Sequence, residues 1–429
     1  MKILNIGGAT AILEHNGKRI LFDPWMDDGI FHGAWYHYPP SKVHIEDLGH
    51  IDYVYISHIH EDHCSAGTIK HLNEDAEIII MDKKPNFVAK FLDNHQFKFK
   101  KIHLVKPKSP LAILPDLTVD ILEGDPANPM ANAIDSTLII RWGDFIIVNA
   151  NDCIPYQEGM DYILKNYEKI DLALLPYGGG SGYPSCYLNL TEEEKASEQK
   201  RIMHNRMEQF VKNVNYLKPK TVMPFADQYA VAGSRSDLNQ YISHPASPGV
   251  IEAFIADKQF DSQLLLLNSG QSYDFTLNEK QPPDPYHHFT LADRDAYLEG
   301  LKGIKYDHEH FQLNPTVALD RLVSHARSRL WQMQQTKNFF PEFTLYLDAN
   351  DLQRRFKINF LNENIEEISF DKACDESFLR ISVSATLLML LLVGHVSWNI
   401  ADAALFLDYE RKPNVYDGKI YEFINYLRV

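Results

Sequence analysis

Short apolar runs with the two-residue alternation of β-strands recur along the first 277 residues. They include residues 3–7, 53–58, 77–81, 137–142, 145–152, 172–178 and 221–225. Helical periodicity is clearest over residues 192–217, where one apolar stripe is formed by Ile202, Met203, Met207, Phe210, Val214 and Leu217. Strands interspersed with helices predict a layered α/β domain over residues 1–277.

A second pattern begins after a segment rich in proline and polar residues, 278–289. It predicts an amphipathic helix near residues 316–335, four alternating strands between residues 343 and 384, and an apolar helix over residues 384–394. We therefore expect a linker over residues 278–315 and a smaller α+β domain over residues 316–429, with a weak resemblance to sterol-carrier folds. Each domain is expected to have its own core, so residues 1–280 should hold a metal alone.

Composition restricts the class of partner. The chain has 42 Lys and Arg residues against 58 Asp and Glu residues, a formal charge of −16, which disfavours nucleic-acid binding and favours a small-molecule substrate. The longest apolar run is about half of the ~20 residues that a membrane span needs. The start of the chain does not have the pattern of a signal peptide, and the four cysteines form no C-x-x-C pair. These features predict a cytoplasmic protein without a membrane span.

The candidate chemistry lies in the run YISHIHEDH, directly after a predicted strand. It places His58, His60, Asp62 and His63 within six residues. Alternate residues of an extended segment face the same side, so His58 and His60 can hold one metal, while the following turn brings Asp62 and His63 to a neighbouring position. Imidazoles with a carboxylate suit zinc, iron or manganese. The sequence therefore predicts one or two divalent metal ions.

This H-x-H-x-D-H run, placed after a hairpin that ends in Asp23-Pro24-Trp25, resembles the metallo-β-lactamase superfamily. Several segments resemble the metallo-β-lactamase portion of CMP-N-acetylneuraminate hydroxylases: residues 39–41, the GGGSGYP loop at 178–184, residues 223–226 and residues 411–416. L-ascorbate-6-phosphate lactonase-like hydrolases are a more distant likeness. The resemblance implies an αββα sandwich with metal at the edge of the sheets, a metal-bound hydroxide as nucleophile, and Asp62 as a metal ligand that also orients the water.

The resemblance also implies ligands outside the run. It expects a bridging aspartate after a strand, which Asp152 matches, and a histidine in the preceding loop, where Asp125 is the nearest chemical substitute. The last family histidine is expected after residues 221–225, a region that offers Asp227, Asp237 and, further on, His244. Either carboxylates complete the site, which favours iron or manganese over zinc, or the site is partial.

Other residues have both structural and functional interpretations. The GGGSGYP loop either presents backbone N–H groups to an anion or is a plain turn. Arg235 either binds a phosphate or carboxylate or is solvated. The aromatic run at residues 25–38 either forms a wall of the active site or packs in the core. Cys64 and Cys153 are expected to be small buried hydrophobes.

Three functions are compatible with these observations. The first is a metal-dependent hydrolase that acts on an ester, lactone or phosphoester of a small, anionic molecule. The second is an iron-dependent oxygenase of a sugar-nucleotide-like or other biosynthetic substrate. The hydroxylases carry a Rieske domain with C-x-H and C-x-x-H pairs, which this sequence lacks, so an oxygenase would need a separate electron-transfer partner. The third is a non-catalytic binding protein with a degenerate metal site. Of these three functions, we favour the hydrolase. Self-association into a homo-oligomer stays open.

Overall fold

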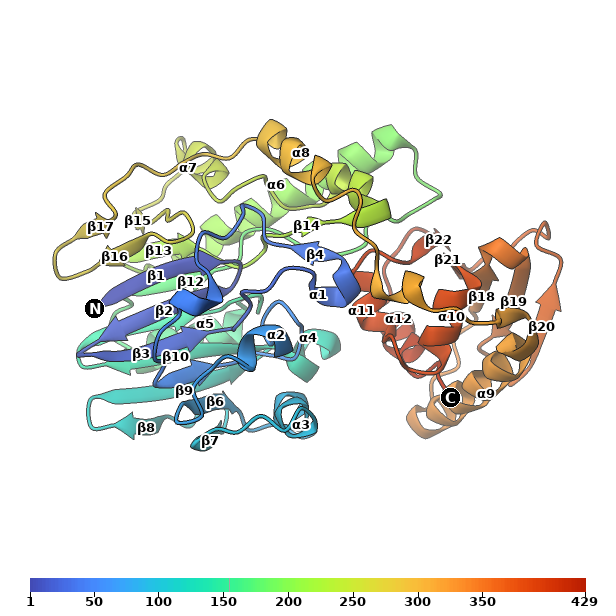
Figure 1. Ribbon diagram of the computed structural model, residues 1–429, viewed down its shortest axis with the longest axis horizontal. Helices are drawn as coiled ribbons and strands as arrows, with labels where there is room; N and C mark the ends of the chain where they lie inside the picture. Colours follow the sequence, from blue (N-terminus) through green and yellow to red (C-terminus); the bar gives the residue numbers. More distant parts are fainter. Residues whose placement is uncertain (154) are drawn as a thin grey trace.

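Two β-sheets lie face to face in the amino-terminal part of the computed structural model, which describes residues 1–153 and 155–429, without the side chains of residues 129, 130 and 315–317 (Figure 1). The first sheet has the order β17 (Glu279–Gln281), β16 (Ser272–Asp274), β1 (Lys2–Gly7), β2 (Thr10–His15), β3 (Lys18–Phe22), β5 (Tyr53–Tyr55), β6 (Glu77–Met81) and β7 (Lys101–Val105). The second has the order β15 (Gln263–Leu264), β13 (Thr221–Pro224), β12 (Leu172–Leu175), β11 (Phe145–Asn149), β10 (Ser136–Trp142), β9 (Leu117–Glu123) and β8 (Leu111–Leu114).

Helices cover the outer face of each sheet. The first sheet packs against α2 (Ala66–Ile69) and α3 (Phe87–Asn94), and the second against α5 (Gln157–Asn166), α6 (Glu192–Leu217) and α7 (Val250–Ile255). Between the sheets, the inward side chains of both form one apolar core, which includes Leu13, Phe22, Leu138, Ile140 and Leu172. These layers are the predicted αββα sandwich, because alternating strands must bury one face against another layer.

Four strands of the sandwich end near one edge, and the predicted chemical residues follow them. β5 leads into the histidine run and pairs in parallel with β3, while β11, β12 and β13 pair in parallel with one another. Asp152 follows β11, the GGGSGYP loop follows β12, and Asp227 follows β13. Because the carboxyl ends of parallel strands meet at one edge, the topology brings these segments together.

Shorter elements join the sandwich to the rest of the chain. They are α1 (Ile30–Gly33), the β4 (Trp35–Tyr36) and β14 (Ala230–Val231) pair, α4 (Pro129–Ile134), and the 3₁₀ segments η1 (Ile45–Asp47) and η2 (Gly233–Tyr241). The interval 278–315 contains more structure than a linker needs. β17 adds to the first sheet, and α8 (Leu291–Glu299) and η3 (Asp307–His310) follow it.

The carboxy-terminal part is an α+β domain around a five-stranded mixed sheet, with the order β20 (Ile365–Ile368), β19 (Arg354–Asn359), β18 (Thr344–Ala349), β21 (Phe378–Val383) and β22 (Asp408–Lys412). Its other elements are α9 (Pro315–Lys337), η4 (Asn350–Leu352), α10 (Ala385–Leu392), α11 (Trp398–Ala403) and α12 (Gly418–Ile424). Four of the strands and the helices α9 and α10 match the predicted pattern, whereas the edge strand β22 was not predicted. The likeness to a sterol-carrier fold stays a prediction.

The two parts share buried apolar contacts. One cluster joins Trp25, Phe31 and Trp35 of the sandwich side with Leu388 and Trp398 of the carboxy-terminal domain. α11 lies against α1, and α12 lies against α4 (Figure 1). None of the described helices has the length and apolarity needed to cross a membrane.

Candidate metal centre

Hydrogen bonds fix the orientation of two histidines of the motif. The Nδ1 atom of His63 lies 2.9 Å from Oδ2 of Asp23, and Nδ1 of His58 lies 2.9 Å from Oγ of Ser57. The Ser57 hydroxyl donates to Asp23 at 2.9 Å, so its oxygen lone pairs are free to accept from His58. We assign the proton of both imidazoles to Nδ1 from this network. Nε2 of His58 is therefore left with a lone pair for a ligand, and Nε2 of His63 can offer one when it carries no proton.

His60 has the opposite tautomer. Its Nε2 lies 2.8 Å from Oδ1 of Asn399, an oxygen that only accepts, so the proton is on Nε2. The unprotonated Nδ1 then lies 2.9 Å from the unprotonated Nε2 of His58. Two nitrogen lone pairs this close repel each other unless a cation lies between them or one ring takes up a proton. The arrangement fits a metal held by His58 and His60.

A second set of donors lies beside the first. Nε2 of His63 is 3.0 Å from Oδ2 of Asp152 and 3.3 Å from Oδ2 of Asp62. Among the described residues, ligand atoms of His58, His63 and Asp152 all lie within 4.8 Å of one another. The structure thus brings together five of the six predicted ligands, and their donor set of imidazole nitrogen and carboxylate oxygen suits one or two divalent ions.

Charge in this cluster is strongly perturbed. Burial lowers the pKa of His63, but the carboxylates of Asp152, Asp62 and Asp23 outweigh burial and raise it well above its usual value. Burial, with the neighbouring His63 and His60 rings, lowers the pKa of His58 well below its usual value. A cation at the cluster would replace the proton on His63 as the partner of these carboxylates.

Two further carboxylates face the cluster. Asp227 accepts hydrogen bonds from the backbone N–H groups of Tyr177 and Gly178, both at 2.9 Å, and lines the same cavities as Asp152. Asp135 follows α4 and lines the larger cavity. Burial, and after it the charge of Asp152, raises the pKa of each to about 7. Asp227 was one of three alternatives from the sequence. Asp135 was missed, although its place directly before β10 is a signal that could have found it.

The other residues that the sequence offered as ligands or anion-binding groups do not join the cluster. Asp125 is in a turn, where it accepts from the backbone N–H of Ala127 at 2.8 Å, and it lines neither cavity described below. Asp237 is exposed on η2. His244 is buried, with its Nδ1 3.1 Å from the carbonyl of Pro245. Arg235 forms a 2.6 Å ion pair with Asp408, so its role is to join the two domains.

The cluster opens onto two cavities. The larger, of about 650 Å³, lies between the two domains and is lined by His58, His60, Asp135, Asp152 and Asp227, by the glycine loop, and by residues of α11, β22 and α12. The smaller, of about 180 Å³, is lined by Asp62, His63 and the aromatic side chains of Trp25, Phe31, Trp35 and Tyr229. The larger volume is within the ~300–1,000 Å³ typical of small-molecule sites. The aromatic run both packs in the core and forms a cavity wall.

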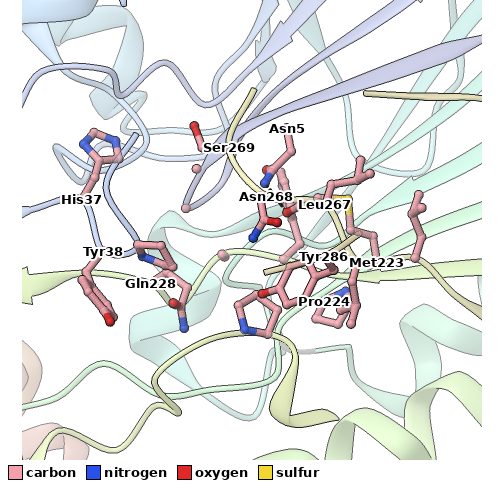
Figure 2. A pocket seen from close by; sticks show the side chains of 18 residues that line it. Asn5, His37, Tyr38, Met223, Pro224, Gln228, Leu267, Asn268, Ser269 and Tyr286 are labelled. Atoms are coloured by element: carbon pink, nitrogen blue, oxygen red, sulfur yellow. Dashed lines mark hydrogen bonds between the residues drawn. The ribbon is translucent and has the colours of Figure 1, made fainter. Parts of the chain in front are cut away.

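A third space lies between the sheets' edge and the loop after β13. Figure 2 shows Asn5, Gln228, Asn268 and Tyr286 around it. Its volume is about 50 Å³, which is room for a few waters at most. We therefore assign substrate binding to the cavities that reach the histidines.

Cys64 and Cys153 are buried beside the cluster, and burial raises the pKa of both thiols, so they are packing groups as expected.

Comparisons with known proteins match part of the chain. Residues 18–225 match the family model described as beta-lactamase superfamily domain. The chain is 28% identical over 322 residues to a Mycobacterium tuberculosis protein that carries the name of a Rieske 2Fe-2S iron–sulfur protein, a match that covers 70% of this chain and 59% of that protein. It is 32% identical over 249 residues to the cytidine monophosphate-N-acetylneuraminic acid hydroxylase of Cricetulus griseus, covering 55% of this chain and 41% of the hydroxylase.

One solved structure is similar to part of the chain. The isothiocyanate hydrolase from Delia radicum gut bacteria is 19% identical, with a TM-score of 0.45, and the match covers 64% of this chain and 99% of the hydrolase. Residues 18–225 thus match a beta-lactamase superfamily domain within the two-sheet sandwich, and a further α+β domain follows the sandwich. It spans 59% and 41% of the lengths of the two relatives named above.

Proposed function

We propose that the protein is a metal-dependent hydrolase that acts on an ester, lactone or phosphoester bond of a small anionic molecule. The observation that carries the proposal is the tautomer network. Ser57, Asp23 and Asn399 each hold one ring nitrogen of a histidine, and the free nitrogens face one another or the carboxylates of the cluster. Such partners orient metal-binding histidines, and the cluster borders a cavity of about 650 Å³.

Bound divalent ions would supply a nucleophile near neutral pH, by lowering the pKa of a water molecule. The chain's own residues have separate tasks. His58, His60, His63, Asp62 and Asp152 would hold the ions, and Asp62 would also accept a proton from a bound water. Asp227, whose pKa is raised to about 7, can exchange a proton with solvent or a leaving group near neutrality.

A second candidate, an iron-dependent oxygenase, is favoured by one observation in particular. Four carboxylates, those of Asp62, Asp135, Asp152 and Asp227, surround three histidines, and oxygen-rich donor sets favour iron or manganese over zinc. The hydroxylase relative adds support. This function requires a reductant, which a separate electron-transfer partner would supply. The third candidate, a non-catalytic binding protein, is disfavoured by the completeness of the donor set.

Elemental analysis of the full chain, purified without added metal, tests the proposal. We expect one or two equivalents of zinc, iron or manganese in the wild type, and loss of at least nine-tenths of it in a His58→Ala, His60→Ala double variant that keeps its circular dichroism spectrum. A His310→Ala, His325→Ala variant is the matched control, because both of these side chains are exposed on the surface. Unchanged metal content in the first variant would refute the site assignment.

Activity assays then distinguish the two proposed activities, hydrolase and oxygenase. Hydrolysis of a panel of lactones, carboxylic esters and phosphodiesters without oxygen or reductant supports the hydrolase. Substrate-dependent oxygen consumption that needs a reductant, together with iron as the bound metal, supports the oxygenase. A protein that binds no metal at all refutes both.

A further inference from the structure

A buried arginine lines the same cavity as the metal cluster, but on the side formed by the carboxy-terminal domain. Arg411 lies on β22, and its side chain is 8% exposed. Its Nε donates to Oδ1 of Asn414 at 2.9 Å, and one terminal nitrogen donates to the hydroxyls of Tyr187 and Tyr421, both at 3.2 Å. All of these acceptors are neutral.

Arg411 differs in this respect from two other arginines that are removed from solvent. Arg355 pairs with Asp348 at 2.7 Å, and Arg235 pairs with Asp408 at 2.6 Å. Within the described part of the chain, Arg411 forms no ion pair with a carboxylate. A guanidinium that is removed from water without a counterion is costly, so the cost is offset when an anion binds.

Aromatic rings hold this guanidinium in place. Its carbon lies 4.7 Å from the ring centre of Tyr187 and 5.0 Å from that of Tyr183, so the guanidinium lies against both rings. The hydroxyls of Tyr187 and Tyr421 lie 2.7 Å apart. These contacts leave the second terminal nitrogen of Arg411 without a protein partner among the described residues, and the side chain lines the cavity. The N–H groups of this nitrogen can donate to an oxygen of a phosphate or carboxylate.

A second cation lines the same cavity from the sandwich domain. Arg206 of α6 lies beside the glycine loop, close to Gly179, and forms no ion pair among the described residues. Two arginines without carboxylate partners therefore line one cavity of a chain with a formal charge of −16. An anion in this cavity would therefore lie near two guanidinium groups that have no carboxylate partner.

We propose that Arg411 and its tyrosines form an oxyanion-binding subsite for the part of the substrate that does not react. This inference rests on the proposed function, because it takes the metal cluster as the place of reaction. The ligand class is an elongated organic anion. Its phosphate or carboxylate lies against Arg411, its body lies along Tyr409 and Tyr416, and its reacting bond reaches the histidines. The carboxy-terminal domain is thereby assigned a part in choosing the substrate.

Binding of inorganic phosphate and phenyl phosphate to the full chain tests the subsite, both after removal of metal with a chelator and after loading with zinc. Isothermal titration calorimetry measures the dissociation constant. We expect Arg411→Gln to raise the dissociation constant of phenyl phosphate at least tenfold in both forms, and Arg411→Lys to raise it less. Arg321→Gln, which removes the same charge from an exposed position of α9, should leave it within twofold.

A further variant covers the case in which Arg411→Gln does not fold. Tyr416 is 62% exposed and lines the cavity, so Tyr416→Ala spares the core. It should weaken phenyl phosphate binding at least threefold and leave inorganic phosphate unchanged. The proposed subsite is overturned if the dissociation constant of Arg411→Gln for phenyl phosphate is within twofold of the wild-type value. It is also overturned if the wild type binds neither probe. If the wild type does not retain zinc after loading, the proposed hydrolase is overturned. The measurements on the chelator-treated protein then still decide whether the subsite exists.

Discussion

Oδ1 of Asn399 lies 2.8 Å from Nε2 of His60, although the two residues are 339 positions apart in the sequence. His60 belongs to the sandwich domain, and Asn399 is in α11 of the carboxy-terminal domain. The amide oxygen accepts the ring proton, and this selects the tautomer whose Nδ1 faces His58. The second domain thus orients a predicted metal ligand of the first.

Replacing Asn399 should weaken metal binding without removing a ligand. In Asn399→Ala, His60 can take either tautomer and rotate, so we expect metal affinity to fall by about 10- to 100-fold, the usual cost of losing such a partner. Asn399→Asp keeps an acceptor oxygen and should retain most of the affinity. Competition with a chromophoric chelator measures the constant. Asn364→Ala, on an exposed loop, is the control, and equal affinities of Asn399→Ala and this control would contradict the role.

The two domains should not separate cleanly. The shared cluster around Trp25, Phe31 and Trp35 is covered by α10 and α11, so residues 1–280 alone expose an apolar surface larger than soluble monomers tolerate. We expect this fragment to aggregate on expression and to become soluble when residues 281–429 are co-expressed. Soluble fraction and metal stoichiometry are the measurements. A soluble fragment with full metal content would instead support two independent cores, as the sequence suggested.

The sequence predicted the sandwich and the centre of the site because both depend on local patterns. Alternating apolar runs place strands, and the spacing of His58, His60 and His63 places three candidate ligands on one loop. Asn399 carries no such pattern, since it reaches the cluster only through tertiary packing, and Asp135 is marked only by its place directly before β10. β22 was missed for the same reason, because its charged residues, including Arg411, pair with β21 at a sheet edge that faces the cavity. Asp125 was favoured by nearness in sequence, and the structure does not bring it to the cluster.

Metal binding should weaken in mild acid, and Asp227 should account for part of the effect. Its pKa is raised to about 7 by burial and by Asp152, so it carries a proton below pH 7 that a metal must displace. The contribution of Asp227 to affinity therefore rises as pH increases from 6 to 7 and flattens above 7. The Asp227→Asn variant has no such proton, so its metal affinity should rise less steeply between pH 6 and 7. The difference from wild type should be up to tenfold per pH unit. Chelator competition at several pH values measures it. Parallel pH profiles of the two proteins would show that Asp227 does not titrate with metal binding.

His244 provides a prediction about stability outside the ligand set. Burial lowers its pKa from 6.5 to about 4, and among the described residues its Nε2 has no hydrogen-bond partner. A histidine with a lowered folded pKa stabilises the fold fully above pH 6.5, and this stabilisation is lost as pH falls from 6.5 towards 4. At pH 5 the loss is about 2 kcal/mol, since each pH unit below 6.5 costs about 1.4 kcal/mol.

Thermal unfolding of the wild type and of His244→Gln, at pH 5 and at pH 7.5, measures this loss. Glutamine does not titrate, so the wild type should lose more stability than the variant on going to pH 5, by about 2 kcal/mol. His325→Gln, at an exposed position of α9, should show the pH dependence of the wild type. The comparison uses differences between proteins at one pH, so titration within the metal cluster, which all three share, cancels. A gap between wild type and His244→Gln that is the same at both pH values would mean that His244 takes up its proton in the folded protein as readily as in the unfolded chain.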